Sequence, residues 1–372
     1  MNIGFFTDSY FPQVNGVTYT VELWRRKLEE RGHNVYIYYP GEGSYTPKER
    51  EYPFKSVGLN FYKGYRFAMP LNISDETKHL DIIHEHGVVG MAVAGLLAAR
   101  THKIPKILTF HTPIDEYTQY LTSNRILIWV LKGMYRPWER ILLNSFDLVT
   151  TASQAIRERL EGNGVRDVEV LSNGIDLSQF YRVDGSGFRR EYGIEDSKVI
   201  GFCGRLSYEK HVEDLINAAD RFNGTILIAG KGPAEEYYKK LAEGKRNVKV
   251  LGFLNRNTLR EFYSTLDVFV FPSVAETQGL VALESMAAGV PVVGVPVLAL
   301  KNTITNGVTG YHYARGNIDE LLQKIEECYK NKSILSKNCL MEAERNSVEK
   351  SIDRLEEIYS GLSTRRMTFK PT

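Results

Sequence analysis

The sequence predicts an α/β protein with two doubly wound domains that face a central cleft. Three observations lead to this fold class. Short apolar runs alternate with helical stretches along the chain, the alternation restarts once near the middle, and 372 residues are enough for two hydrophobic cores. Such alternation is typical of parallel sheets with helices on both faces, because each crossover helix packs on one face of its sheet.

The first series of elements is expected within residues 1–180. Each predicted strand is a short apolar run bounded by turn residues, and helices fill most of the intervals. The expected strands are Asn2–Phe6, Val35–Tyr39, Asp81–His84, Lys106–Phe110, Asp147–Thr151 and Val168–Leu171. The expected helices are Val17–Arg31, Val88–Thr101, Ile126–Leu143, which Pro137 should interrupt, and Ser153–Gly162.

The second series is expected within residues 181–346, after a break between Asn173 and Ser197 that is rich in turn residues. A polar-faced helix over residues 347–372 is a candidate to pack back on the first domain. The expected strands are Val199–Cys203, Thr225–Ala229, Val248–Leu251, Val268–Phe271 and Pro291–Gly294. The expected helices are His211–Arg221, Pro233–Glu243, Thr258–Leu266 and Leu280–Ala288.

Composition and charge exclude several classes of protein. With 43% hydrophobic and 25% charged residues the chain is ordinary globular, and a net charge of +2 gives no reason to expect nucleic acid as a partner. Three cysteines without metal-binding spacing fit a reducing compartment. The N-terminus lacks the pattern of a signal peptide, and Met91–Ala99 and Ile126–Leu131 are too short to span a membrane. We therefore expect a cytoplasmic protein, or one that lies peripherally on the cytoplasmic face of a membrane.

The segment from Phe271 to Glu284 carries the first candidate site. A predicted strand ends at Phe271 and a helix opens near Gly279, so free backbone N–H groups at the helix start would form an anion site. Glu276 precedes this helix and Glu284 lies in its second turn. The alternative interpretation is an ordinary helix whose acidic residues stabilise its positive end.

Two further strand ends offer phosphate chemistry. After the first strand of the second series, Arg205 and Lys210 stand in a loop, where a guanidinium fork and an ammonium suit a diphosphate. Both could instead be solvated loop charges. After the first strand of the chain, Gly16 opens a helix and provides another phosphate-compatible helix start, or else a plain turn. The spacing G-x-G-x-x-G is missing after that strand, which argues against an NAD-dependent oxidoreductase.

Histidines end two other predicted strands. His111 can hydrogen-bond a sugar hydroxyl, or it can simply cap its loop. His84 and His86 share one face of their strand, but a zinc site would need further ligands, so we expect no metal. The chain contains no Asp-X-Asp pair, with which metal-dependent sugar transferases commonly hold a divalent ion. Cationic side chains and helix starts would therefore have to stabilise a leaving diphosphate.

Together these segments resemble the family-four retaining glycosyltransferases of the GT-B fold. The match spans nearly the whole chain, and four motifs occur in order at strand ends. They are Asp8–Val17, Asn173–Asp176, Gly204–Lys210 and the E-x7-E pair Glu276/Glu284. The resemblance implies transfer of a hexose from a UDP- or GDP-sugar to an acceptor, with retention of the anomeric configuration and without an obligatory metal.

The resemblance also implies roles for individual residues. The implied catalytic residues are His111 at the transferred sugar, Arg205 and Lys210 at the diphosphate, and Glu276 at the donor sugar. They act by charge stabilisation and positioning, because the departing phosphate oxygen would serve as base in a front-face attack. Glu284 would accept hydrogen bonds from the ribose hydroxyls, within a donor-binding group that consists of Gly16, Gln278, Gly279, Leu280, Val281 and Glu284. Gln278 departs from the bulky apolar residue of many relatives, which leaves the identity of the sugar open.

The acceptor side is inferred from two stretches without Asp or Glu, Tyr52–Ser74 and Tyr117–Trp138. Both combine aromatic and basic residues, which suits an anionic membrane surface, and both lie in the domain that holds the acceptor in similar enzymes. We expect a membrane glycerolipid as the acceptor. The alternatives are an ordinary amphipathic helix with an internally packed loop, a soluble sugar acceptor, a nucleotide-sugar epimerase of the same fold, and a non-catalytic binding module. The candidate residues on this side are Tyr62, Lys63, Arg66, Trp129, Lys132 and Arg136.

Overall fold

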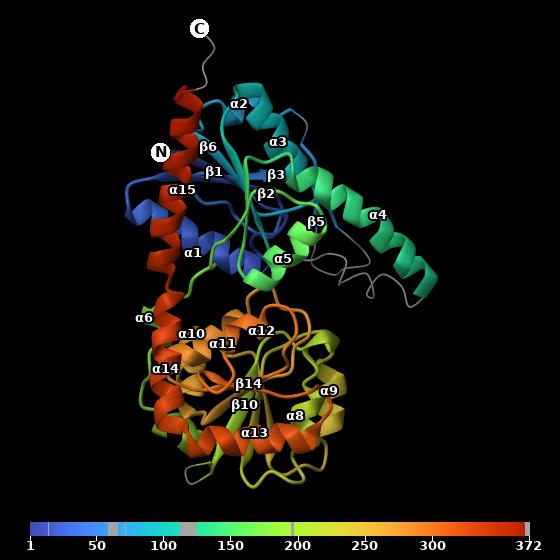
Figure 1. The fold of residues 1–372 in the computed structure, drawn as a ribbon, viewed down its shortest axis with the longest axis vertical. Helices are drawn as coiled ribbons and strands as arrows, with labels where there is room; N and C mark the ends of the chain where they lie inside the picture. The colour runs from blue at the N-terminus through green and yellow to red at the C-terminus, as the bar shows by residue number, and fades with distance from the viewer. Residues whose placement is uncertain (14, 59–65, 71, 112–124, 195–196, 369–372) are drawn as a thin grey trace. The chain divides into compact units, whose positions relative to one another are not determined.

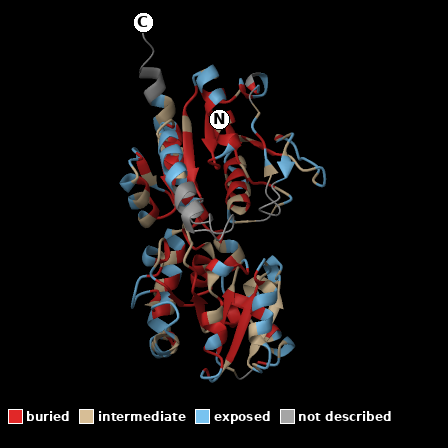
Figure 2. Ribbon diagram, turned by 90° about the vertical axis from the view of Figure 1, so that its right-hand side faces the viewer, coloured by how far each residue is buried: buried red, intermediate tan, exposed pale blue. Residues whose placement is uncertain are grey.

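A computed structural model describes residues 1–13, 15–58, 66–70, 72–111, 125–194 and 197–368, with the backbone alone at 74, 125–132 and 365–368. The chain divides into two compact units (Figure 1). Unit 1 comprises Met1–Asn173 and Val348–Thr372, and unit 2 comprises Gly174–Ser347. In each unit the buried residues concentrate on the sheet and on the helix faces that cover it (Figure 2).

The sheet of unit 1 has seven parallel strands in the order β3-β2-β1-β6-β7-β8-β9. The order reverses between β1 and β6, and ligands of open parallel sheets bind outside the carboxyl ends of the strands at such a switch point. The bounds are β1 Asn2–Phe6, β2 Asn34–Pro40, β3 Glu51–Phe54, β6 Ile82–Glu85, β7 Lys106–Phe110, β8 Leu148–Thr151 and β9 Val168–Val170; β4 Val57–Gly58 and β5 Arg66–Phe67 form a separate antiparallel pair.

Helices cover both faces of this sheet because its strands are apolar on both sides. In β2, Val35 and Ile37 pack into a core with α1 and α15, whereas Tyr38 points to the other face and packs into a core with α3. The bounds are α1 Gly16–Glu30, α2 Ser74–Thr77, α3 Gly90–His102, α4 Arg125–Leu143, α5 Gln154–Gly162 and α15 Val348–Thr368.

Helix α4 continues through Pro137, and the expected interruption there is wrong. Proline removes one helical hydrogen bond, to the carbonyl of Gly133 four residues earlier. Both residues are exposed, so water can solvate the carbonyl that lacks a helical donor.

The C-terminal helix α15 packs on unit 1, beside α1 (Figure 1). Its buried Leu355 and Tyr359 share the core of Trp24, whose indole N–H donates to the Asn173 carbonyl (2.7 Å). On the outside, Arg31 at the end of α1 forms ion pairs with α15 acids, among them Asp353 at 2.7 Å. Helix α15 therefore completes the hydrophobic core in which α1 lies.

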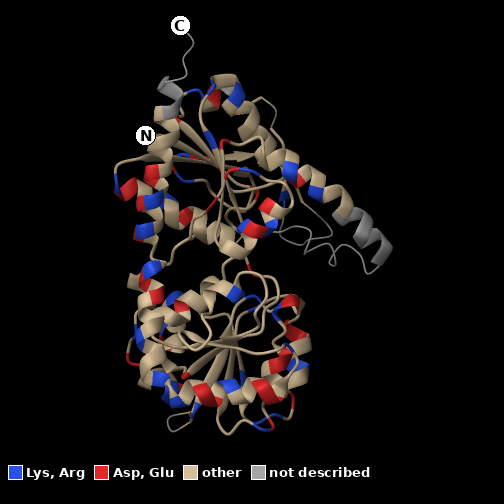
Figure 3. Cartoon of the chain, viewed as in Figure 1, with Lys and Arg blue, Asp and Glu red and all other residues tan. Residues whose placement is uncertain are grey.

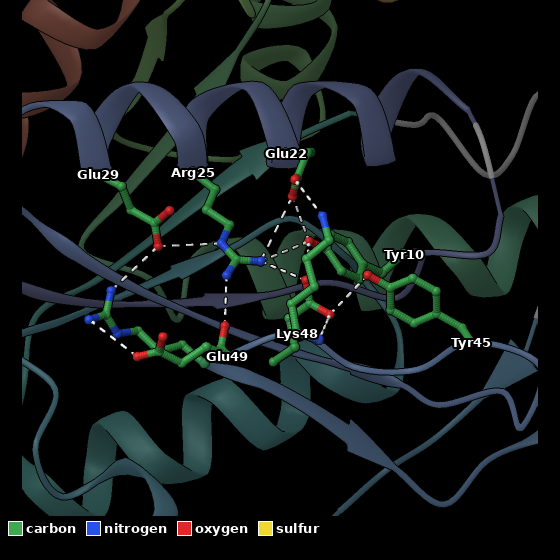
Figure 4. A network of polar contacts seen from close by, with 9 residues as sticks. Tyr10, Glu22, Arg25, Glu29, Tyr45, Lys48 and Glu49 are labelled. Carbon is green, nitrogen blue, oxygen red and sulfur yellow. Dashed lines mark hydrogen bonds and ion pairs between the residues drawn. The ribbon is translucent and has the colours of Figure 1, made fainter.

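A buried polar network joins α1 to β3 in unit 1 (Figure 4). Arg25 of α1 donates through Nη1 to Glu51 Oε1 at 2.6 Å, and Tyr10 donates to the same oxygen at 3.1 Å. The other oxygen of Glu51 accepts from the Tyr45 hydroxyl at 3.0 Å and from the Lys48 backbone at 2.9 Å. Arg25 and Glu51 are both buried, so each side chain is the closest partner that the other has for its charge.

Unit 2 contains six parallel strands in the order β12-β11-β10-β13-β14-β15, again with a switch point beside the first strand, between β10 and β13. The strands are β10 Val199–Cys203, β11 Thr225–Ala229, β12 Val248–Gly252, β13 Val268–Phe271, β14 Val292–Gly294 and β15 Gly310–His312. The helices are α6 Leu177–Phe180, α7 Ser186–Glu191, α8 Glu213–Asn217, α9 Glu235–Ala242, α10 Arg256–Thr265, α11 Leu280–Ala287, α12 Leu300–Thr303, α13 Ile318–Lys330 and α14 Lys332–Arg345.

Ile175 and Phe180 belong to the core of unit 2, whereas the sequence analysis assigned residues up to 180 to the first domain. Turn residues mark where a chain bends, but they do not show on which side of the bend an apolar residue packs. Of the predicted helix His211–Arg221, only the residues of α8 form a regular α-helix.

Charged residues of both signs are interspersed along the outer helices, in agreement with a net charge of only +2 (Figure 3). Within the part of the chain that is described, no helix is long and apolar enough to cross a membrane.

Candidate donor and acceptor sites

The strand end of β13 leads into a tightly built turn and then into α11. Gly279 caps this helix with a φ of 83°, and a Cβ there would lie 2.8 Å from Leu300 Cδ2, so a residue with a side chain would be strained at this position. The N–H groups of Leu280 and Val281 precede the first hydrogen bond of the turn, from Ala282 N to the Gly279 carbonyl at 2.9 Å. These two N–H groups are therefore not used by the hydrogen bonds of this turn.

The loop before α11 is held from two directions. The hydroxyl of Thr303 in α12 donates to the carbonyl of Gln278 at 2.6 Å, and the Val274 N–H donates to the Glu209 carbonyl at 3.0 Å. The side chain of Gln278 is buried, and Glu276 is partly buried. The loop after β13 is thus tied to the loop after β10, which carries the candidate cations.

Glu284 is a buried carboxylate on α11, and its Oε2 accepts a hydrogen bond from the Tyr263 hydroxyl of α10 at 2.7 Å. Burial raises the pKa of Glu284 to about 7, against the lowering effects of the Tyr263 hydroxyl and the Arg256 charge. A carboxylate in this position can accept hydrogen bonds from ligand hydroxyls, provided that it is ionised.

Lys210 and Glu276, from neighbouring strand ends, form an ion pair. The Lys210 ammonium also lies 5.9 Å from the centre of the Phe271 ring, within range of a cation–π contact. Both charged side chains are largely buried, and each retains 14% exposure. The structure therefore brings together two of the predicted catalytic residues, while Arg205 lies exposed in the same loop as Lys210.

The loop that carries Arg205 is fixed by close backbone contact between the ends of β10 and β11. Gly230 has a φ of 132°, and a Cβ there would collide with the carbonyl oxygen of Gly204. Next to it, the Leu206 N–H donates to the Lys231 carbonyl at 3.0 Å. Glycine at this crossing allows the two strand ends to approach each other.

In unit 1, Gly16 is the first residue of α1, and it is exposed. The helix is capped by Asn15, whose side chain accepts from the Thr18 N–H at 3.0 Å. A Cβ on Gly16 would meet no atom within 4 Å, so packing inside the unit does not require glycine.

His111 lies at the carboxyl end of β7 and contacts a second histidine that the sequence analysis gave no catalytic role. His111 Nε2 lies 2.9 Å from His86 Nδ1, and the two rings stack with centres 5.3 Å apart. Burial lowers the pKa of His111 to about 3 and that of His86 well below its usual value. Both rings are therefore neutral, and the hydrogen bond between them shares one proton.

His84 lies deeper and bonds the Tyr359 hydroxyl of α15 at 2.6 Å and the Thr109 hydroxyl at 2.6 Å. It is a core residue, and both of its ring nitrogens are hydrogen-bonded. Within the described residues, no group of three or more His, Cys, Asp or Glu side chains is placed to hold a metal ion.

The predicted acceptor residues are only partly described. Tyr62 and Lys63 lie outside the described residues, as do the side chains of Trp129 and Lys132. Arg66 packs on its own hairpin, where Nε donates to the Ser56 hydroxyl at 2.7 Å. Arg136 is exposed on α4. These residues are not brought into one cluster by any contact among the described atoms.

A hollow of about 370 Å³ opens beside α4 in unit 1, and the sequence analysis did not predict it. The Trp138 indole N–H donates to the Val88 carbonyl at its wall (3.3 Å), and Trp138 itself is 43% exposed. Beyond it, Met134 and Ile141 are more than half exposed on α4. The hollow is lined almost entirely by apolar groups, from Phe67, Met69, Val88, Val89, Gly90, Val93, Tyr135 and Trp138.

Two protein-family models match this chain. The family described as "Glycosyltransferase Family 4" matches residues 14–179, and the family "Glycosyl transferases group 1" matches residues 187–346. The chain is also 30% identical over 340 residues to an alpha-monoglucosyldiacylglycerol synthase of Streptococcus pneumoniae, covering 84% of this chain and 75% of that protein. The chain belongs to the family-four glycosyltransferases. It is therefore a hexosyltransferase.

The relatives of this glycosyltransferase do not all carry the same name. An alpha-monoglucosyldiacylglycerol synthase of Acholeplasma laidlawii is 25% identical and covers 97% of both chains. A GDP-mannose-dependent alpha-mannosyltransferase of Corynebacterium glutamicum is 26% identical over 83% of this chain and 76% of that protein. Family membership alone therefore leaves donor and acceptor open.

Solved structures confirm the GT-B fold of this glycosyltransferase. Anabaena HepE in complex with UDP matches with a TM-score of 0.79 at 20% identity, over 97% of this chain and all of that one. A sucrose-phosphate synthase of Thermosynechococcus elongatus matches with a TM-score of 0.76 at 18% identity, over 98% and 99% of the two chains. At these identities the likeness concerns the fold alone.

Proposed function

We propose that this glycosyltransferase moves a hexose from a UDP- or GDP-sugar to a membrane glycerolipid, with retention of the anomeric configuration and without an obligatory metal. Unit 2 binds the donor and unit 1 binds the acceptor. The observation that carries the donor half is the pair of strand ends in unit 2, where Lys210 and Glu276 meet near a helix start and Glu284 lies buried behind it.

Different residues of the donor site contact the diphosphate, the ribose and the transferred sugar. The N–H groups at the start of α11 and the cations Arg205 and Lys210 stabilise the diphosphate, and more so as charge develops on the leaving group. Glu284 accepts hydrogen bonds from the ribose hydroxyls, and Glu276 faces the sugar. Because Glu276 forms an ion pair with Lys210, the diphosphate competes with it for the ammonium. For Gly16 and His111 in unit 1, contact with the phosphates and with the transferred hexose stays a prediction.

A thermal-shift panel of UDP-, GDP- and ADP-sugars tests the donor half. One base should raise the midpoint of unfolding, because a ligand that binds only the folded state stabilises it. Glu284→Ala should abolish the shift, and Glu326→Ala, at an exposed position of α13, should leave it unchanged. The absence of any shift in the wild-type protein would contradict the proposal.

The lipid acceptor is supported by the apolar hollow of unit 1 and by the two diacylglycerol-glycoside synthases among the relatives. Apolar side chains in a hollow match a hydrocarbon chain, since each buried CH₂ contributes about 0.8 kcal/mol. Incubation of a labelled donor with diacylglycerol lipids and with soluble sugars separates the acceptor classes. A glycosylated lipid with retained configuration by NMR is expected, whereas transfer to soluble sugars alone would contradict the lipid acceptor.

Peripheral membrane binding is supported by α4. Its exposed Arg136 and Arg140 lie four residues apart on one face, and Ile141 is 63% exposed. Flotation with vesicles should require anionic lipid and should weaken with salt. Ile141→Ser should reduce it, and Ile334→Ser, at a similarly exposed isoleucine of unit 2, should not. Equal binding to neutral and anionic vesicles would argue against the basic surface.

A further inference from the structure

The Tyr263 hydroxyl lies beside Glu284, and the packing of the tyrosine ring does not explain why a hydroxyl is present there. Tyr263 stands on α10, and its ring lies in an aromatic cluster with Phe180, Phe262 and Phe269. This cluster would accept a phenylalanine equally well. The hydroxyl of Tyr263 instead points at Glu284 Oε2, 2.7 Å away, and both side chains are buried.

Because of this hydrogen bond, the two oxygens of the Glu284 carboxylate have different surroundings. Oε2 is held by Tyr263, while Oε1 makes no hydrogen bond to any described residue. A charged acceptor bonded on one oxygen loses rotational freedom, so the other oxygen is presented in one direction. That arrangement suits a ligand with hydroxyl donors, such as the ribose of a nucleotide.

Tyr263 also affects the charge of Glu284. The groups that face this carboxyl are Tyr263 and Arg256 from α10 and the Cys203 thiol at the end of β10. Burial raises the pKa of Glu284, and the donated hydrogen bond opposes that rise. Cys203 is uncharged, because burial raises the pKa of its thiol far above neutrality. Without the hydroxyl, the carboxyl would be both less fixed and more often protonated.

We propose that Tyr263 is a positioning residue for the nucleotide: its hydroxyl orients Glu284 so that the site distinguishes ribose from deoxyribose. The proposal rests on the proposed donor site, because it assumes that Glu284 meets the ribose. The tyrosine itself does not touch the ligand.

The test compares Tyr263→Phe with Tyr313→Phe as a matched control. Tyr313 is also buried in unit 2, and its hydroxyl also donates to a buried carboxylate, Asp214 Oδ2, at 2.8 Å. Binding of UDP, GDP and their 2′-deoxy analogues is measured by calorimetry on the full chain. The base that binds more tightly to the wild-type protein is used for the comparison.

The wild-type protein should prefer the ribonucleotide. Tyr263→Phe should weaken ribonucleotide binding about tenfold while changing the deoxy analogue little, because the lost interaction acts through the sugar hydroxyl. Its binding should also decline at a higher pH on acidification than that of the wild type. Tyr313→Phe should change neither the preference nor the pH profile.

Three results would overturn the inference in distinguishable ways. If neither UDP nor GDP binds the wild type, the proposed donor site fails and the inference with it. If the ribonucleotide and its 2′-deoxy analogue bind the wild type equally, Glu284 does not contact the 2′-hydroxyl. If the preference is present and Tyr263→Phe keeps it in full, the donor site stands and the role of Tyr263 alone is wrong.

Discussion

Glu284 illustrates the conflict between folding and ligand binding at the scale of one residue. Its raised pKa, about 7 against 4.5, means that the folded chain binds this proton more tightly than the unfolded chain. The resulting stability is fully present below about pH 4.5 and is lost as the pH rises through about 7. The ionised form that a ribose needs is thus the form that burial disfavours.

Glu284→Gln should therefore stabilise the protein at pH 8 by at most about 3 kcal/mol, and hardly at all at pH 4.5, because the amide is neutral at every pH. Urea unfolding at both values measures the difference, and nucleotide binding should weaken in the same variant. An equal change of stability at the two pH values would show that the carboxyl is not destabilised by its charge.

The His86–His111 pair leads to a second prediction at this scale. His86 Nε2 is buried without a hydrogen-bond partner among the described residues, which costs less for an unprotonated nitrogen than for an N–H. His86 should therefore carry its proton on Nδ1 and donate to His111 Nε2, so that His111 presents its own Nδ1–H to a ligand.

Nitrogen-15 NMR of labelled protein reads the two tautomers directly. Both rings should stay neutral between pH 5 and pH 8, because burial lowers both pKa values. A His111 protonated on Nε2 at pH 7 would contradict the assignment, and a His111 that titrates near its ordinary pKa would contradict the burial.

The positions of some of these residues were predictable and those of others were not. Gly279 at a helix start and Glu284 within that helix were placed from the sequence, because a glycine between a strand end and an apolar helix is a local pattern, and their roles stay predictions. Tyr263 and His86 were not recognised as parts of a site, because each acquires its contact from a partner 21 or 25 residues away, through a fold that brings separate strand ends together. Whether Arg205 and Gly16 contact the donor stays a prediction.

At the scale of elements, the network of α1 and β3 predicts a large and specific loss of stability (Figure 4). Glu51→Ala leaves Arg25 buried without its closest acceptor, which should cost about 3–5 kcal/mol in urea unfolding. Glu169→Ala removes an ion pair of similar length, 2.8 Å, from the exposed Arg354, and should cost less than about 1 kcal/mol. Equal losses in the two variants would refute the buried network as a source of stability.

Element prediction succeeded where apolar runs are continuous. Strands such as Asn2–Phe6 and Val268–Phe271 were predicted to the residue, since a buried parallel strand leaves an uninterrupted hydrophobic stretch. The edge strands β3 and β15 were missed, because an edge strand is short and tolerates residues such as Pro53. The apolar hollow was missed because Phe67, Val88 and Trp138 form it from three separate segments.

At the scale of the whole molecule, the two units have separate cores, so a core substitution should act locally. Leu355→Ala on α15 and Leu335→Ala on α14 both remove a fully buried leucine side chain and should each cost about 2–5 kcal/mol. Hydrogen-exchange mass spectrometry should show faster exchange mainly in unit 1 for the first variant and mainly in unit 2 for the second. Uniform acceleration across both units in either variant would show that they unfold as one.

The return of α15 to unit 1 also has a consequence for biosynthesis. A ribosome makes the chain from its N-terminus, and the first domain to emerge is ordinarily the first to fold. Here all of Gly174–Ser347 is synthesised before Val348, Leu355 and Tyr359 can reach the core around Trp24. Unit 2 can therefore begin to fold during translation, while unit 1, begun earlier, waits for α15 with an apolar face of α1 uncovered. The nascent chain should need protection at its beginning for longest, and a chaperone would find its binding site there.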